Sequence, residues 1–562
     1  MPLQRLSLTF ARSLAVLLLL LPLAAHAQTA PASAKPTGTI SGKVTVNQKG
    51  APEILVAAQS LDRPLQQASA RARSDAAGRY RLTGLPAGQY QITAIAPALA
   101  PEQTGSSAPM YRASKSVVLA AGEEADDVDI KLVHGGVITG RVTDADGKPV
   151  IEERINLQMV DQAGNVNNQG NVPMWNYQMS VTDDRGIYRI YGLSAGRYRV
   201  SVGSMEGGFM MSRNRTYYAV TFYGNTSDAA KASIVELQEG TEATNIDIRV
   251  GRAANTFVAS GRIVDAENGQ PIPGIRFMYG PARANQPFYG GFVGMPTSAR
   301  GEFRMEGLEP GRYGVSVSAS FESSAHYSDP VFFEIVDGDV TNLEVKAMRG
   351  LTLSGFVVFE GSRAKEIQQN IGTLRASASV TSPSSPQNQT SSSSSIAADG
   401  GFQLSGVRPG KVRLYVASMS SSVLRGITVL RVERGGVDVT QTLEAQAGES
   451  ITDLRIVASL GAGTIRGTVK FVGGEPPPNL MMFVSTRRDS TTPSGAGPVD
   501  ARGLFLINSL TSGTYDVILS MNYIGASAPR AMRPQTQTVT VTDGAETQVD
   551  FVVDLTPKEG GP

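Results

Sequence analysis

The sequence predicts an all-β chain built as a tandem array of five β-sandwich modules. One segment of alternating polar and apolar residues recurs five times along the 562 residues. Successive copies lie about 100 residues apart, which is the length of one sandwich domain and exceeds the roughly 20–50 residues of a solenoid repeat. Each copy therefore marks a module that buries a core of its own. The turn glycines of the five copies are Gly78, Gly186, Gly301, Gly400 and Gly503.

The first copy predicts two strands around a tight corner. Tyr80 and Leu82 alternate with arginines, and Tyr90 and Ile92 alternate with polar residues after Gly88. An apolar residue at every second position is typical of a half-buried strand. The intervening glycines allow the positive φ that a tight turn needs. We therefore expect the repeat to build a core and not a site.

A tyrosine corner, in which a buried Tyr hydroxyl binds nearby backbone, is expected at the Leu-x-x-Gly-x-Tyr part of each copy. The fourth copy departs most from this pattern. Val412 replaces the tyrosine there, and Ala397 replaces the aspartate that opens the turn in other copies. The sequence therefore does not predict whether module 4 forms this corner.

The N-terminal residues predict export. Arg5 and Arg12 form a basic region, and residues 14–23 are an apolar run too short to favour a spanning helix. Ala25-His26-Ala27 is a cleavage site, after which no membrane span is expected, so the protein is placed in the periplasm or at the cell surface/extracellular side. The predicted segments are a signal peptide (1–27), a disordered leader (28–37), modules 1 to 5 (38–133, 134–252, 253–348, 349–459 and 460–556) and a tail (557–562).

Composition excludes several classes of function. The net charge is +1, which argues against a nucleic-acid partner. The chain has no Cys, which excludes disulfides, zinc–thiolate sites, a cysteine nucleophile and a lipoprotein anchor. Its 60 glycines fit a turn-rich β-structure.

Two recurring patterns together resemble the carboxypeptidase regulatory-like domain. One is the Gly-x-Val opening, as in Gly42-Lys-Val44 and Gly140-Arg-Val142, and the other is the repeat described above. The resemblance covers nearly all of residues 38–555. It implies a Greek-key sandwich of about seven strands per module, prealbumin-like (transthyretin-like) or immunoglobulin-like. It also implies a non-catalytic role beside peptidases, in front of outer-membrane receptors or in surface arrays, although carbohydrate-binding-like and Cna-B-like sandwiches look similar.

No catalytic residue, metal site or cofactor is predicted. His134 and His326 remain once residues 1–27 are removed, and neither opens a zinc-protease pattern. Asp144 and Asp146 precede Gly147, but a calcium loop needs more oxygen ligands, so a turn is expected there. The sequence also has no nucleophile elbow and no phosphate-binding loop.

Aromatic residues in inserted loops and an extended segment of modules 2 and 3 are the best candidate binding surface. Loops on a rigid scaffold carry binding, and exposed rings suit sugar faces or partner proteins. The alternative is that the rings fold back and pack between modules, because aromatic side chains are more often buried than exposed. The candidate ligand-binding residues are Trp175, Tyr177, Tyr217, Tyr218, Phe288, Tyr289 and Phe292.

The favoured interpretation is a non-enzymatic exported protein that serves as a cell-envelope binding or scaffold protein. One alternative is a polysaccharide-binding protein that uses the aromatic loops of modules 2 and 3. A second is an accessory module for a membrane receptor or peptidase. A hydrolase with an unrecognised site is disfavoured by the scarcity of His and the absence of Cys. The expected partner is a polysaccharide or an envelope protein, and the ligand and oligomeric state stay open.

Overall fold

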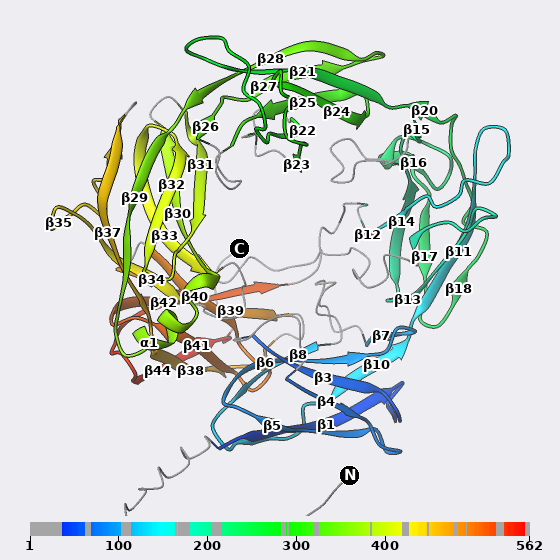
Figure 1. The fold of residues 1–562 in the computed structure, drawn as a ribbon. Helices are drawn as coiled ribbons and strands as arrows, with labels where there is room; N and C mark the ends of the chain where they lie inside the picture. Colours follow the sequence, from blue (N-terminus) through cyan, green and yellow to red (C-terminus); the bar gives the residue numbers. More distant parts are fainter. Residues whose placement is uncertain are drawn as a thin grey trace, which may run out of the picture. The chain divides into compact units, whose positions relative to one another are not determined.

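The computed structural model of the chain is almost entirely β-structure (Figure 1). Within the described residues there are five hydrophobic core clusters, one in each module. The predicted all-β array of five Greek-key sandwich modules is therefore confirmed. The structure describes residues 36–61, 69–102, 114–162, 164, 166, 180–203, 216–282, 288, 291–318, 325–382, 385–418, 426–446, 449–476, 480–489, 492–523 and 533–556. The predicted signal peptide, most of the leader and the tail lie outside these ranges.

Each module consists of two sheets that share one core. We call the sheet that contains the module's first strand its opening sheet, and the other its second sheet. In module 1 the opening sheet comprises β1 (Gly38–Val46), β2 (Lys49–Gly50), β5 (Arg79–Leu85), β7 (Leu99–Pro101), β9 (Glu124–Ala125) and β10 (Ile130–His134). Its second sheet comprises β4 (Ala70–Arg73), β3 (Leu55–Ser60), β6 (Gly88–Ile95) and β8 (Ser114–Leu119), in that order.

Modules 2 and 3 repeat this plan. The strands of the opening sheet of module 2 are β11 (Gly136–Thr143), β13 (Ile187–Leu193), β18 (Glu242–Ala243) and β19 (Ile248–Arg249), and those of its second sheet are β12 (Ile155–Val160), β14 (Gly196–Val202), β16 (Thr221–Phe222) and β17 (Ile234–Leu237). Module 2 also contains η2 (Ala229–Lys231), and a separate ribbon pairs β15 (Thr216–Tyr217) with β20 (Ala254–Asn255). The strands of module 3 are β21 (Phe257–Asp265), β24 (Glu302–Leu308), β26 (His326–Tyr327) and β28 (Val340–Arg349) in the opening sheet, and β22 (Met278–Pro281), β23 (Phe292–Val293), β25 (Gly311–Ser316) and β27 (Val331–Ile335) in the second.

Modules 4 and 5 have the longest strands. The opening sheet of module 4 comprises β29 (Leu351–Glu360), β32 (Gly401–Val407), β34 (Ile427–Arg434), β35 (Val437–Asp438) and β37 (Ser450–Leu460), and its second sheet β30 (Leu374–Ser382), β31 (Ser385–Ser395), β33 (Gly410–Ser418) and β36 (Glu444–Ala445). Module 4 also contains α1 (Ala364–Gln369) and η3 (Ile371–Thr373). The strands of module 5 are β38 (Gly463–Val472), β41 (Leu504–Leu510) and β44 (Glu546–Asp554) in the opening sheet, and β39 (Leu480–Arg488), β40 (Thr492–Pro498), β42 (Gly513–Tyr523) and β43 (Gln535–Val541) in the second.

The first strand of each module lies between the first strand of the repeat and the strand that closes the module. In module 1, β1 is antiparallel to β5, with Gly42 opposite Tyr80, and parallel to β10, with Val44 opposite Ile130. In module 4, β29 is likewise antiparallel to β32 and parallel to β37. The predicted alternation is also confirmed, because Tyr80 and Leu82 are buried in the core.

The opening glycine of each module is required because the closing strand passes too close for a side chain. A Cβ on Gly42 would lie 2.3 Å from the carbonyl oxygen of Val128, and one on Gly355 would lie 1.8 Å from that of Leu454. Even an alanine would force the two strands apart at such distances. This close approach explains the Gly-x-Val opening, and the same conflict with a carbonyl oxygen occurs at Gly140, Gly261 and Gly467.

The tyrosine corner forms in four modules. The hydroxyl of Tyr90 donates to the carbonyl oxygen of Pro86, four residues earlier, at 2.7 Å. The corresponding tyrosines of modules 2, 3 and 5 also donate to the carbonyl four residues earlier, at 2.7, 3.0 and 2.8 Å, in the pairs Tyr198–Ser194, Tyr313–Glu309 and Tyr515–Thr511. In module 4 the buried Val412 occupies this place, so no tyrosine hydroxyl ties that corner to the backbone.

The turn before each repeat also differs in module 4. In module 1 the carboxylate of Asp75 accepts hydrogen bonds from the backbone N–H groups of Ala77 and Arg79, at 2.9 and 2.8 Å. The hydrogen bonds from Arg79 lower the pKa of Asp75. In module 4, where Ala397 replaces this aspartate, Asp399 accepts the bond from Gly401 N at 2.9 Å instead.

Candidate functional site

Of the four sequence-predicted site residues that the structure describes, two pack against the cores of modules 2 and 3. Tyr218 packs against the core of module 2, and Phe292 packs against the core of module 3, with its ring 5.6 Å from that of Tyr279. Tyr217 lies in the β15–β20 ribbon, where burial raises the pKa of its hydroxyl. Trp175, Tyr177 and Tyr289 lie outside the described residues.

Phe288 lies on the second sheet of module 3. A Cβ on Gly314 would meet the Phe288 ring at 2.8 Å, so the ring covers a bare stretch of β25. The Phe288 ring meets that of Phe332 edge-on at 6.0 Å, and the Phe332 side chain is 46% exposed. The guanidinium of Arg312 stands 5.1 Å from the Phe332 ring centroid. The structure thus brings Phe288 beside an exposed aromatic ring, while ligand binding at the predicted residues stays a prediction.

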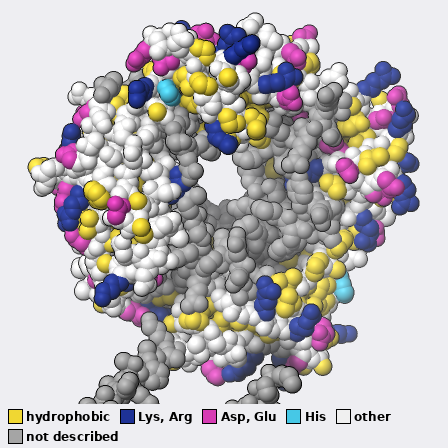
Figure 2. Space-filling model, in the orientation of Figure 1, with side chains coloured by type: hydrophobic (Ala, Val, Ile, Leu, Met, Phe, Trp, Pro, Cys, Tyr) yellow, Lys and Arg dark blue, Asp and Glu magenta, His cyan; other side chains and the backbone are white. Residues whose placement is uncertain are grey.

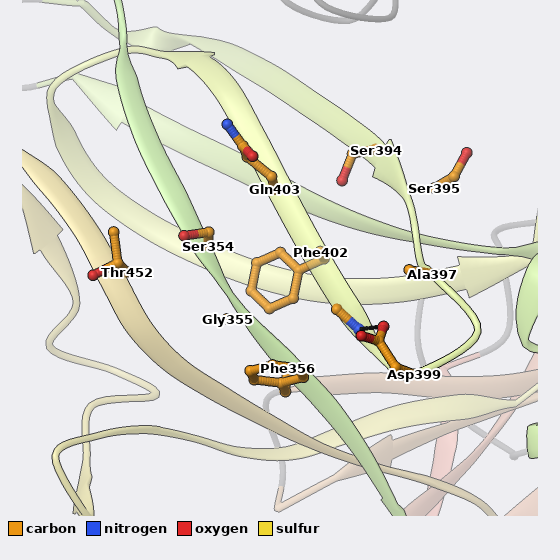
Figure 3. Close-up of a pocket in the computed structure, with 11 residues that line it drawn as sticks. Ser354, Gly355, Phe356, Ser394, Ser395, Ala397, Asp399, Phe402, Gln403 and Thr452 are labelled. Carbon is orange, nitrogen blue, oxygen red and sulfur yellow. Dashed lines mark hydrogen bonds between the residues drawn. The ribbon is translucent and has the colours of Figure 1, made fainter.

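A groove on module 4, which sequence reasoning missed, combines an exposed ring with several polar groups (Figure 3). Its volume is about 520 Å³. Residues of β29, β31, β32, β37 and the turn before β32 line it. They are Ser354, Gly355, Phe356, Ser394, Ser395, Ala397, Asp399, Gly401, Phe402, Gln403 and Thr452.

Strand register places the groove residues together. Ser354 lies opposite Gln403, and Phe356 lies opposite Gly401, on the outer face of the opening sheet. Side chains alternate along a strand, so Leu353 and Val357, which flank these positions, point into the core and are buried. Phe356 is 56% exposed, since the glycine opposite it offers no side chain to cover its ring. A shift in the register of β29 and β37 between Leu353 and Gly355 leaves Thr452 beside this face.

The groove lining contains one hydroxyl group and one carboxylate that bear on ligand binding, those of Ser394 and Asp399. The buried Oγ of Ser394 has no hydrogen-bond partner among the described residues. A buried hydroxyl without a partner loses its hydration and gains nothing in return, so it favours any ligand that supplies a partner. The carboxylate of Asp399 uses one oxygen to accept from Gly401 N, as the dashed line in Figure 3 shows.

The same outer face carries charged residues in the other modules. In module 1, Lys43 and Arg79 occupy the positions of Phe356 and Gly401, and in module 2, Arg189 takes the place of Gln403. Arginines on this face form ion pairs, with nitrogen–oxygen distances of 2.8 Å for Arg81–Glu124, 3.3 Å for Arg189–Glu242, 3.5 Å for Arg262–Glu302 and 3.0 Å for Arg466–Glu546. In module 4 none of the residues that line the groove is Lys or Arg, and Arg455, which lies opposite Phe356 on β37, pairs with Glu433 at 2.7 Å. Figure 2 shows the surface over this module largely white, without a patch of one charge.

An internal comparison of the five copies would have revealed this site. In modules 1, 2, 3 and 5 the residue after the opening glycine is Lys43, Arg141, Arg262 and Thr468, respectively. In module 4 it is Phe356. A large apolar residue at an outward position is the signal, because it contradicts the polar-out pattern of the neighbouring copies. The juxtaposition with Gln403 and Thr452 depends on register, which the sequence does not show.

The described residues contain no group of three or more His, Asp or Glu side chains that could hold a metal ion. In the same part of the chain, no helix has the length and hydropathy of a membrane span. His134 closes β10, and His326 lies in β26, where burial lowers its pKa. Neither histidine lines the module 4 groove.

The chain is similar in part to several solved structures. A Streptococcal ancillary pilin is 16% identical, with 56% of this chain and 99% of that chain covered and a TM-score of 0.24. The Bacillus anthracis TIE protein is 8% identical, with 94% and 76% covered and a TM-score of 0.15. BcpA, the major pilin subunit of Bacillus cereus, is 10% identical, with 55% and 99% covered and a TM-score of 0.15.

No curated protein matches the chain. A family model, in contrast, does match one part of it. That part is residues 39–133, which contain the whole core of module 1. Module 1 is therefore a carboxypeptidase regulatory-like domain.

Proposed function

We propose that this chain is an exported, non-catalytic binding protein of the cell envelope, in which sandwich modules carry binding surfaces on their outer faces. The observation that carries the proposal is the groove of module 4. There an exposed ring and several polar side chains take positions that Lys and Arg hold in modules 1 and 2, beside the Arg455–Glu433 ion pair of the same face. Export rests on the signal-peptide pattern of residues 1–27, and the location is the periplasm or the cell surface.

The make-up of the groove supports binding without catalysis. Asp399 is the one ionisable side chain that lines it. Glycoside hydrolysis uses a pair of carboxyl groups, and acyl transfer uses a nucleophile with a base. One carboxylate surrounded by hydroxyl and amide groups can hold a ligand, but it has no partner for acid–base work.

Co-sedimentation with isolated cell envelopes tests the proposal. We expect the full chain to sediment with envelopes and a Phe356→Ala variant to sediment severalfold less. Tyr415→Ala is the matched control, because Tyr415 is an exposed aromatic residue on the second sheet of the same module. Equal sedimentation of the Phe356→Ala variant and the unaltered chain would contradict the assignment of the site. Cell fractionation with and without residues 1–27 tests export.

A second candidate surface is the aromatic cluster of Phe288, Phe332 and Arg312 on module 3. The observation that favours it is the half-exposed Phe332 ring with a guanidinium beside it. This arrangement suits a polysaccharide or an envelope protein, including a membrane receptor or peptidase served by this chain, because aromatic and Arg side chains dominate binding hot spots. A Phe332→Ala variant in the same sedimentation assay tests it, and unchanged sedimentation would remove this surface from the proposal.

A further inference from the structure

We propose that the groove of module 4 binds an uncharged polysaccharide, with the ring of Phe356 as the stacking surface and the surrounding polar side chains as hydrogen-bonding partners. This inference rests on the proposed function and names its ligand class. It assigns the saccharide site to module 4 and not to the aromatic loops of modules 2 and 3.

The ring of Phe356 is placed for stacking on a flat ligand. It stands on the outer face of β29, is 56% exposed, and lies opposite Gly401. An exposed aromatic ring presents an electron-rich face, which attracts the C–H groups that line one side of a sugar ring. Its neighbours Ser354 and Gln403 are polar, so the ring is a single apolar spot within a polar surface and not part of an extended apolar face.

The polar groups around the ring match the hydroxyl groups of a sugar. Ser354, Ser395 and Thr452 offer hydroxyls that both donate and accept, and Gln403 offers an amide with the same two abilities. The carboxylate of Asp399 is a strong acceptor for hydroxyl donors. The buried Oγ of Ser394 has no partner among the described residues, and a sugar hydroxyl could bond it once the Ser394 side chain turns into the groove.

The single carboxylate in the groove lining favours an uncharged polysaccharide over an anionic one. Asp399 is the one ionisable residue in the lining, and Arg455, which lies opposite Phe356 on β37, already pairs with Glu433 at 2.7 Å, so a uronate, sulfate or phosphate group would meet a carboxylate and no unpaired cation. Arg81 and Arg189 occupy the place of Gln403 in modules 1 and 2, which shows that the same scaffold position accepts a cation.

Affinity electrophoresis of the full chain in gels that contain a soluble polysaccharide tests the inference. The probes are a β-glucan, an α-glucan and a galactomannan as neutral chains, and polygalacturonate as the anionic chain. We expect at least one neutral chain to retard the protein and polygalacturonate not to. The Phe356→Ala variant should lose affinity about fivefold to tenfold, the range expected when one stacking contact is removed. The Tyr415→Ala control should be retarded like the unaltered chain.

A pair of variants separates ligand binding from folding. Asp399→Ala removes a bond that holds the turn, so its loss of retardation alone would be ambiguous. Asp399→Asn keeps an oxygen that can accept from Gly401 N and removes only the charge of the groove carboxylate. This second variant should fold like the unaltered chain and still bind the neutral polysaccharide more weakly.

The outcomes are distinct. Retention by polygalacturonate alone, no retention by any neutral chain, or equal retention of the Phe356→Ala variant would each overturn the inference. If envelopes sediment the unaltered chain in a Phe356-dependent way while no neutral polysaccharide retards it, the binding function stands and the ligand class fails. If neither envelopes nor polysaccharides bind, the proposed function fails as well.

Discussion

Modules 1 and 4 have the same strand plan but differ at three places, which are the turn before the repeat, the corner and the outer face of the opening sheet. In module 1 the Asp75 carboxylate accepts hydrogen bonds in the turn, and the Tyr90 hydroxyl donates one at the corner. The outer face carries the Arg81–Glu124 ion pair. Module 4 has Ala397 and Val412 at the first two places, and at the third it has Gln403 in place of Arg81. Both modules keep the opening glycine and a full core. The comparison indicates that close backbone packing defines the module, whereas the polar ties are replaceable and leave surface positions open to function.

The largest expected effect is on the opening glycine, which both modules share. Gly355→Ala should destabilise module 4 by about 3 kcal/mol or more, because the added Cβ meets the carbonyl oxygen of Leu454. Gly42→Ala should do the same to module 1. Gly372→Ala is the control, since a Cβ there has no neighbour within 4 Å. Hydrogen exchange resolved by peptide reads each module separately. If Gly355→Ala exchanged like Gly372→Ala, close backbone packing would not define the module.

The next largest expected effect is a loss of stability at alkaline pH, which should be greater in module 1 than in module 4. Burial raises the pKa of Tyr80 well above its usual 10.0, and raises that of Tyr188 in module 2 in the same way, whereas module 4 has Phe402 at this place. The unfolded chain releases the proton above pH 10 while the folded module keeps it. Stability is therefore intact below pH 10 and falls by about 1.4 kcal/mol per pH unit per tyrosine above it, until the folded-state pKa is reached.

Hydrogen exchange between pH 10 and 12, corrected for the intrinsic rate, measures this effect. Modules 1 and 2 should open before module 4. Tyr80→Phe should remove the added alkaline sensitivity of module 1, at the cost of the hydrogen bond that the Tyr80 hydroxyl donates to the carbonyl oxygen of Val128 at 2.6 Å. Simultaneous opening of modules 1 and 4 would show that the buried hydroxyl does not control the alkaline limit.

The tyrosine corner should have an intermediate effect. Tyr90→Phe leaves the carbonyl of Pro86 without its donor in a largely buried place, which costs about 1–2 kcal/mol. Tyr415→Phe in module 4 is the matched change, and it should be nearly neutral because Tyr415 is 38% exposed and lies on an outer face. Urea unfolding followed by module-resolved exchange distinguishes the two. An equal response would mean that the corner bond adds nothing beyond packing.

The smallest expected effect concerns the turn. Asp399→Ala should cost module 4 about 1 kcal/mol, since it removes the acceptor for Gly401 N. Ala397→Asp on the same background should recover most of that loss, because aspartate at this position in module 1 accepts from the residue four places later. A double variant no more stable than Asp399→Ala would show that the two aspartates are not interchangeable.

The fold could be predicted because its signals are local. The alternation around Tyr80 and Tyr90, and the glycines between them, lie within one short segment and are repeated in each module. The reason for Gly42 could not be predicted, because the carbonyl that excludes a side chain belongs to Val128, 86 residues later. Register between strands creates that contact, and no short-range pattern encodes it.

The candidate site was missed for the same reason, and for a second one. Phe356 and Gln403 meet only through the pairing of β29 with β32. In addition, the predicted residues lie in inserted loops and an extended segment of modules 2 and 3, and two of them, Tyr218 and Phe292, pack against cores. An aromatic residue in a glycine-rich loop is not a better indicator of exposure than one at an outward strand position, because loop residues can fold back.

The joints between modules have a consequence for the resistance of the chain to proteases. Gly135 alone separates β10 from β11, and Gly350 alone separates β28 from β29. A Cβ on Gly135 would lie 2.5 Å from the Cα of Gly192, so this joint is covered as well as short. Proteases cut exposed flexible segments, and a single covered residue cannot enter their active sites. Digestion should therefore nick loops within modules and leave these two joints intact, so that the nicked chain still holds its modules together.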